Sequence, residues 1–148
     1  MLQTLLAKLA RALEGVGIPY MVVGGQAVLL HGEPRLTRGI DVTLGADSSA
    51  LTRVLALAKS IDLSPAVRDV EQFVQKTSVL SLSGESSAIR VDLIFSFRPY
   101  EAQAIRRATS VSVSDTSVRF ATAEDLVIHK LAAGRPRDLE DVRGILTP

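Results

Sequence analysis

Two aspartates in otherwise apolar segments are the residues of this chain best suited to metal-dependent chemistry. Asp41 lies in GIDVTL and Asp92 lies in RVDLIF. An unpaired carboxylate is costly to bury, so each needs a cation or a hydrogen-bond donor. Mg²⁺ binds through one or two carboxylates and keeps several waters, so Asp41 and Asp92 are candidate ligands of one Mg²⁺. Alternatively, Asp41 is an edge-strand residue that points to solvent.

A pair of glycines follows the apolar segment 20–23 and precedes a predicted short helix over 26–31. Glycine lets backbone N–H groups approach a ligand closely, and the N-terminus of a helix favours an anion. Gly24, Gly25 and Gln26 are therefore candidates to bind a phosphate. Paired glycines can also make a tight strand-to-helix turn with no ligand, and the pair alone does not decide between these readings.

The stretch YMVVGGQAVLLHGEPRLTRGIDVTL resembles the nucleotidyltransferase fold, in particular the AbiEii/MenT-type toxin branch. That pattern has GG-x-A, a spacer, and then R-x-T-x-D-I-D. One position departs from it, because Gly39 stands where the first aspartate is expected. The matching residues are Gly24, Gly25, Ala27, Arg35, Thr37, Ile40 and Asp41.

The resemblance implies a mixed α/β (α+β) fold, with a small mixed sheet flanked by helices. It also implies transfer of a nucleotide from an NTP to an acceptor hydroxyl, with Mg²⁺ as cofactor. In the family a third carboxylate on a neighbouring strand acts as metal ligand or base, and Asp92 is the candidate here. Arg35 and Thr37 belong to the nucleotide-binding motif.

The block ATAEDLVIHKLAAGRPRDLEDV also resembles the family, which often has E-D-L-x-x-x-K followed by R-x-x-D-x-x-D. The resemblance makes Lys130 a catalytic candidate. It makes Arg135 a candidate to neutralise triphosphate charge, and Asp138 a candidate to pair with Lys130 or Arg135. Without the resemblance, the block reads as a solvated amphipathic helix with ordinary i,i+4 pairs.

Gly39 leaves the activity open, because glycine offers no metal ligand. Two carboxylates usually share the metal ions in nucleotidyl transfer. The chain could bind nucleotide without turnover, or it could work with one metal at a reduced rate. A third explanation is that the aspartate was replaced, deliberately or by selection, because an active toxin harms its host.

In the toxin branch the acceptor is often a tRNA 3′ end, and a cognate antitoxin protein is expected as partner. Two alternatives remain: an inactive nucleotide- or protein-binding module of the same fold, and a small-molecule (antibiotic-type) nucleotidyltransferase. An RNA acceptor predicts a continuous basic surface beside the glycine pair. A small-molecule acceptor predicts a closed acidic pocket.

Composition fits one soluble domain over residues 1–148. Hydrophobic residues make up 47% of the chain, charged residues 22%, and the net charge is +1. No cysteine is present, which excludes disulfides and cysteine metal sites. Neither a signal peptide nor a membrane span is expected, so a cytoplasmic location is predicted.

Apolar periodicity and turn residues predict the order helix, strand, helix, strand, helix, hairpin and further helices. Asp69 and Glu71 are interpreted as loop charges, and Leu139 and Leu146 are expected to face inward. The expected helices cover 2–15, 26–31, 48–60, 99–107, a segment from 123 to about Gly134, and a last helix beyond Pro136. The expected strands cover 20–23, 40–44, 77–82, 88–95 and part of 111–120.

Overall fold

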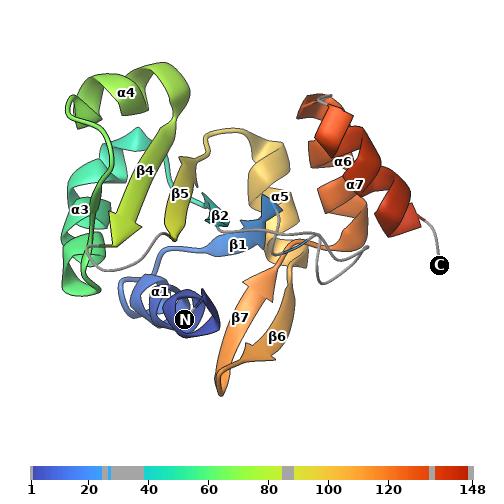
Figure 1. Cartoon of the computed structure of the whole chain (residues 1–148), viewed down its shortest axis with the longest axis horizontal. Helices are drawn as coiled ribbons and strands as arrows, with labels where there is room; N and C mark the ends of the chain where they lie inside the picture. The colour runs from blue at the N-terminus through green and yellow to red at the C-terminus, as the bar shows by residue number, and fades with distance from the viewer. Residues whose placement is uncertain (1, 25–26, 28–38, 85–88, 134–135, 147–148) are drawn as a thin grey trace.

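The computed structural model describes residues 2–24, 27, 39–84, 89–133 and 136–146. Its strands form one seven-stranded mixed sheet in the order β3-β4-β5-β2-β1-β7-β6, with helices packed around it (Figure 1). The expected mixed α/β class is confirmed. The strands are β1 (Tyr20–Val23), β2 (Gly39–Leu44), β3 (Leu63–Pro65), β4 (Val79–Gly84), β5 (Arg90–Phe95), β6 (Thr109–Val113) and β7 (Thr116–Phe120).

Four helices have limits close to the sequence expectations, namely α1, α5, α6 and α7. The predicted helix over 26–31 lies outside the described residues, apart from residue 27. The elements are α1 (Leu2–Gly15), the 3₁₀ turn η1 (Ser48–Ala50), α3 (Leu51–Ser60), α4 (Val70–Thr77), α5 (Pro99–Arg107), α6 (Ala123–Ala133) and α7 (Pro136–Leu146).

The centre of the sheet is formed by β5, β2 and β1. Strand β2 runs parallel to β5 and antiparallel to β1, and β1 runs parallel to β7. All four residues of β1 are buried, as its continuous apolar run predicts for a central strand. These three strands carry the residues of the candidate site.

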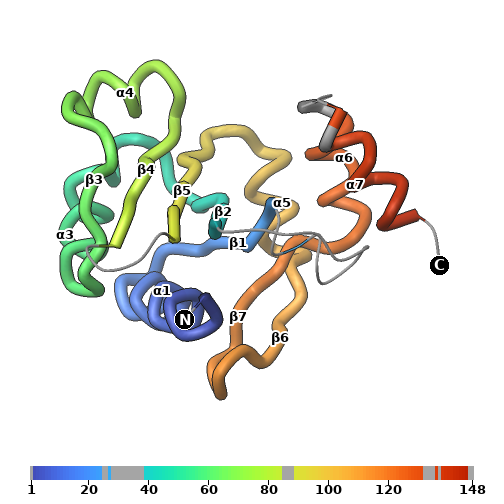
Figure 2. The backbone as a smooth tube through the Cα atoms, in the orientation of Figure 1, coloured from blue at the N-terminus to red at the C-terminus, as the bar shows by residue number. Residues whose placement is uncertain are grey.

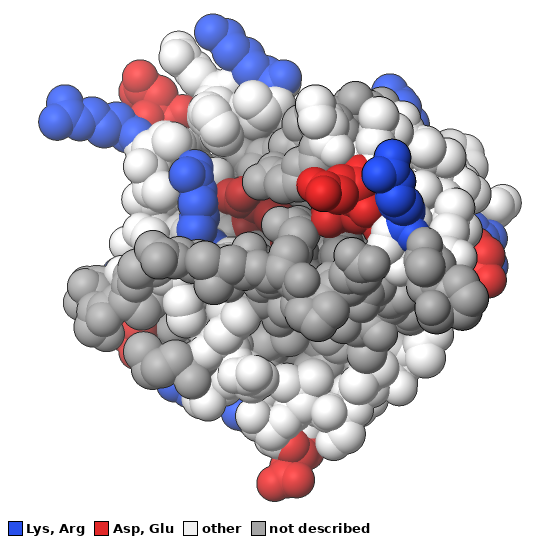
Figure 3. Space-filling view, turned by 45° about the vertical axis from the view of Figure 1, so that its right-hand side comes forward, with Lys and Arg blue, Asp and Glu red and all other residues white. Residues whose placement is uncertain are grey.

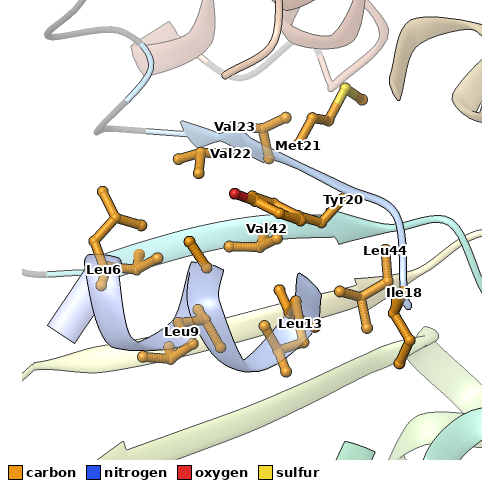
Figure 4. Close-up of a cluster of buried hydrophobic side chains, with 14 of the residues drawn as sticks. Leu6, Leu9, Leu13, Ile18, Tyr20, Met21, Val22, Val23, Val42 and Leu44 are labelled. Atoms are coloured by element: carbon orange, nitrogen blue, oxygen red, sulfur yellow. The ribbon is translucent and has the colours of Figure 1, made fainter. Parts of the chain in front are cut away.

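Helix α1 covers one face of the sheet with its apolar side. Leu6, Leu9 and Leu13 recur at helical spacing and are at most 3% exposed. In Figure 4 they lie against side chains of β1 and β2, including Tyr20 and Val42. The side chains of the central strands that face α1 therefore belong to the core, and the aspartates of β2 and β5 lie on the opposite face.

Local signals account for the ends of several helices. Asp47 accepts a hydrogen bond from the backbone N–H of Ser49 (2.9 Å) and so caps the 3₁₀ turn η1 that precedes α3. Pro99 occupies the first turn of α5. At the other end of α5, Arg119 of β7 donates to the carbonyls of Ile105 and Ala108, both at 3.0 Å.

Some sequence expectations are wrong. Glu71 is not a loop charge, because it lies in the first turn of α4, and Asp69 directly precedes that helix. The single buried residue of α4, Val74, gave too weak an apolar pattern to predict a helix. Strand β4 consequently begins at Val79 rather than at residue 77. Leu139 and Leu146 are 49% and 69% exposed, because other residues of α7, such as Val142, make its buried face.

Helices α6 and α7 form an antiparallel pair side by side, at the end of the molecule away from α3 and α4 (Figure 2). No helix in the described segments is long and apolar enough to cross a membrane.

Candidate active site

Asp41 and Asp92 are direct neighbours on adjacent strands. In the parallel pair of β2 and β5, the Cα of Asp41 is paired with the Cα of Asp92. Paired residues of adjacent strands project from the same face of a sheet. Because side chains alternate along a strand, the apolar neighbours of both aspartates project from the other face. The strand register therefore places these two residues on one face of the sheet.

Asp92 is oriented by a residue that the sequence did not single out. The hydroxyl of Ser81 in β4 donates to Oδ1 of Asp92 at 2.7 Å, and Ser81 is only 2% exposed. Ser81 lies between Leu80 and Leu82, both fully buried. A serine between two leucines of a strand is the signal that could have found it, because a buried hydroxyl needs a partner.

Arg90 lies beside Asp92 on the same face of β5. Its Nε is 3.6 Å from Oδ1 of Asp92, and its Nη2 donates to the Ser81 hydroxyl at 3.3 Å. Gly39 of β2 is paired with Arg90 in the strand register. The position at which the family pattern has its first aspartate therefore lies directly opposite a cation.

Gly24 directly follows β1 and lies against the carboxylate of Asp41. Its φ is +69°, a left-handed conformation that glycine adopts without strain. A Cβ built on Gly24 would lie 2.1 Å from Oδ2 of Asp41, so no other residue fits without moving that side chain. The remaining motif candidates Gly25, Gln26, Arg35, Thr37 and Arg135 lie outside the described residues.

Lys130 is buried between two carboxylates. Its Nζ is 3.0 Å from Oδ1 of Asp138 and 3.2 Å from Oδ2 of Asp141. All three side chains are at most 5% exposed. The expected pairing of Lys130 with Asp138 is present, and Asp141 is a further partner. The ion triad joins α6 to α7 across the connection between them.

A second polar network ties α5 to α6 through Asp125. Arg107 donates from Nε to Oδ2 (3.0 Å) and from Nη2 to Oδ1 (2.8 Å) of this carboxylate, and Tyr100 donates its hydroxyl to Oδ1 at 2.9 Å. The hydrogen bonds from Arg107 are the main cause that lowers the pKa of Asp125. Burial, followed by the bond to Asp125, raises the pKa of Tyr100 to about 12.

Acidic side chains gather at a hollow on one face of the molecule, bordered by lysine or arginine side chains (Figure 3). This face also carries residues outside the described part of the chain. Its charge is mixed rather than continuously basic.

The donor set fits one divalent cation. Two carboxylates on one face, with the backbone of Gly24 against one of them, give a small oxygen-rich site of the kind that suits Mg²⁺. Among the described residues no group of three or more His, Cys, Asp or Glu side chains could hold a metal ion.

Residues 2–146 match the family described as nucleotidyltransferase of unknown function (DUF6036). No curated protein sequence matches the chain.

Solved structures of similar shape support the fold. A lincomycin-bound lincosamide antibiotic adenylyltransferase, LnuA, aligns with a TM-score of 0.66 at 14% identity, over 97% of this chain and 96% of that one. The antibiotic-resistance factor ANT(2'')-Ia aligns with a TM-score of 0.67 at 15% identity, over 99% and 83%. An antigenic nucleotidyltransferase-like protein from Paracoccidioides brasiliensis aligns with a TM-score of 0.62 at 20% identity, over 98% and 73%.

Proposed function

Because the chain belongs to the DUF6036 nucleotidyltransferase family, we propose that it transfers a nucleoside monophosphate from an NTP to an acceptor hydroxyl and releases pyrophosphate. One observation carries this proposal: Asp41 and Asp92 are paired across β2 and β5 on one face of the sheet. Two neighbouring carboxylates repel each other and so do not stabilise a sheet, whereas in phosphate chemistry they can hold a metal ion.

In this proposal Asp41 and Asp92 hold one Mg²⁺. When bound, Mg²⁺ supplies positive charge that stabilises the phosphate oxygens during transfer. Ser81 holds Oδ1 of Asp92 and leaves Oδ2 for the cation or for a proton from the attacking hydroxyl. Gly24, together with Gly25 and Gln26, offers backbone N–H groups to the triphosphate, and Arg35, Thr37 and Arg135 complete the nucleotide contacts.

Lys130 and Asp138 serve this site from a distance in our proposal. Lys130 is 4% exposed and engaged by two carboxylates, so its charge is already compensated. We assign it the task of holding α6 against α7, so that the connection between these helices, including Arg135, is placed for the nucleotide.

The acceptor proposed first is an RNA hydroxyl, such as a tRNA 3′ end, in a toxin–antitoxin pair. This proposal rests on the resemblance of the glycine motif to the toxin branch. A small-molecule hydroxyl is the second candidate, and a specific observation favours it. In Figure 3 acidic side chains lie at a hollow bordered by lysine or arginine, and this mixed charge suits a compact acceptor better than a long polyanion.

The experiment is a transfer assay with each of the four α-³²P-labelled NTPs and MgCl₂. Total RNA, tobramycin and lincomycin are supplied as separate acceptors. We expect a labelled acceptor with the unaltered protein, and a loss of at least about a hundredfold with Asp41→Asn or Asp92→Asn. The matched control is Asp62→Asn, an exposed residue with φ of +62° that asparagine tolerates.

The outcomes separate the candidates. Label on RNA supports the toxin reading, and label on an antibiotic supports the small-molecule reading. ATP binding in calorimetry without label on any acceptor supports the inactive binding module. Label that persists in Asp41→Asn and Asp92→Asn contradicts the proposed roles of both carboxylates.

A further inference from the structure

Arg90 presents a cation at the edge of the candidate metal site. Its side chain is 60% exposed, although it lies on the same face as Asp92 and opposite Gly39. An arginine that served only to neutralise Asp92 would be expected to make a close, bidentate pair with it. The observed geometry differs from that expectation.

The contacts of Arg90 are long. The separation of 3.6 Å from Asp92 exceeds the roughly 2.7–2.9 Å of a charge-assisted hydrogen bond. The separation of 3.3 Å from the Ser81 hydroxyl lies beyond the usual range for N–H···O bonds. A guanidinium carries a fork of donors, and these two contacts engage Nε and Nη2 only weakly.

Gly39 leaves the adjacent position on β2 without a side chain. A Cβ there would lie 3.3 Å from the carbonyl oxygen of Arg90, which shows how closely the two strands approach at this point. A ligand that approaches Asp41 and Asp92 along this face therefore meets no side chain from residue 39. Among the described residues, Arg90 is a cation beside that path.

We propose that Arg90 binds a phosphate group of the nucleotide beside Gly39. This inference rests on the proposed function. Two carboxylates cancel the charge of one divalent ion, so a triphosphate at this site needs a further cation. The planar fork of arginine matches the oxygens of phosphate, and here it replaces the charge that a second metal ion would bring.

The test uses inorganic tripolyphosphate, which carries no nucleoside and cannot be transferred. Isothermal calorimetry in 5 mM MgCl₂, a concentration we choose to saturate the metal site, measures its affinity for the unaltered protein, Arg90→Gln and Arg90→Lys. We expect a loss of about tenfold for Arg90→Gln and a smaller loss for Arg90→Lys, which keeps the charge without the fork. Lys8→Gln is the control for charge, because Lys8 is exposed on α1, over the other face of the sheet.

A second measurement separates phosphate binding from an effect on Asp92. Mn²⁺ titration followed by electron paramagnetic resonance, without phosphate, should show affinity in Arg90→Gln equal to or tighter than in the unaltered protein, since a neighbouring positive charge is lost. Unchanged tripolyphosphate affinity in Arg90→Gln, or no binding to the unaltered protein, overturns the proposal. Neither measurement depends on nucleotide transfer. The proposed transfer activity can therefore be wrong while the phosphate-binding role of Arg90 holds, and the role of Arg90 can be wrong while the transfer activity holds.

Discussion

The end of β1 lies directly against a carboxylate of β2: a Cβ built on Gly24 would be 2.1 Å from Oδ2 of Asp41 and 2.9 Å from its Cβ and Cγ. The left-handed φ of +69° at Gly24 gives the same residue a second reason to be glycine. The glycine of the motif therefore determines where the Asp41 side chain can lie, in addition to any contact with phosphate.

Gly24→Ala should consequently impair metal binding. The new methyl group must displace the Asp41 carboxylate, and the backbone conformation is unfavourable for alanine. We expect Mn²⁺ affinity to fall by at least about tenfold in an electron paramagnetic resonance titration, and unfolding by urea to occur at lower concentration. Gly15→Ala is the matched control, since a Cβ there meets nothing within 4 Å and its φ is not positive. Equal Mn²⁺ affinity in the two variants would contradict the role given to Gly24.

Asp41 and Asp92 should behave as one site. If both carboxylates hold the same ion, Asp41→Asn and Asp92→Asn each remove most Mn²⁺ affinity, and the double variant loses little more than either single one. Ser81→Ala should cost a smaller amount, about tenfold, because it frees Asp92 Oδ1 without removing a ligand. Losses that simply add in the double variant would indicate two independent sites.

The sequence predicted these two aspartates because each interrupts an apolar strand, and alternation requires only local information. The parallel pairing that brings them together was beyond such reasoning, since register between distant strands is set by the whole sheet. Ser81 was missed for the same reason, because its partner is eleven residues away across a hairpin. Helix α5 was predicted to its exact ends by Pro99 and a basic last turn. Helix α4 was not predicted, because it buries one side chain.

The Asp125 network should make stability depend on pH in the acid range. The pKa of Asp125 is lower in the folded protein than in the unfolded chain, where it is about 3.9. The contribution of Asp125 to the free energy of unfolding is therefore present above the unfolded pKa and is lost as the pH falls through the folded pKa. At pH 7, Asp125→Asn should lower the midpoint of thermal unfolding by about 5 °C. The difference between the two proteins should shrink as the pH is lowered from 5 to about 2.5 in calorimetric scans. A constant difference over that range would show that ionisation of Asp125 does not stabilise the fold.

Lys130 should matter more for stability than for direct nucleotide contact. Lys130→Met leaves Asp138 and Asp141 buried without their shared cation, which costs about 3–5 kcal/mol when a buried pair is broken. Urea unfolding measures this cost. Lys59→Met is the control, because Lys59 is exposed and the same substitution there breaks no buried ion pair. If Lys130 instead contacts the triphosphate, Lys130→Met will weaken ATP binding while the free energy of unfolding stays unchanged.

Gly39→Asp is the most informative single change. Residue 39 precedes Asp41 by two positions in β2, so an aspartate there would project from the same face and bring a third carboxylate to the site. The φ of Gly39 is not positive, and the close approach of 3.3 Å to the Arg90 carbonyl requires only a small shift. We expect Mn²⁺ to bind more tightly and transfer to rise by at least about tenfold, or on the order of 1.4 kcal/mol in the barrier. If the protein is a toxin, toxicity in cells should rise with it.

Gly39→Asn is the control for this change, because it fills the same space without adding a charge. Gly39→Asp should therefore exceed both Gly39→Asn and the unaltered protein in metal affinity and in transfer. A Gly39→Asp protein that binds Mg²⁺ and NTP no better and transfers no faster than the chain with Gly39 would remove the main support for catalysis. The reading as a nucleotide- or protein-binding module of this fold would then replace it, since that reading requires no complete metal site.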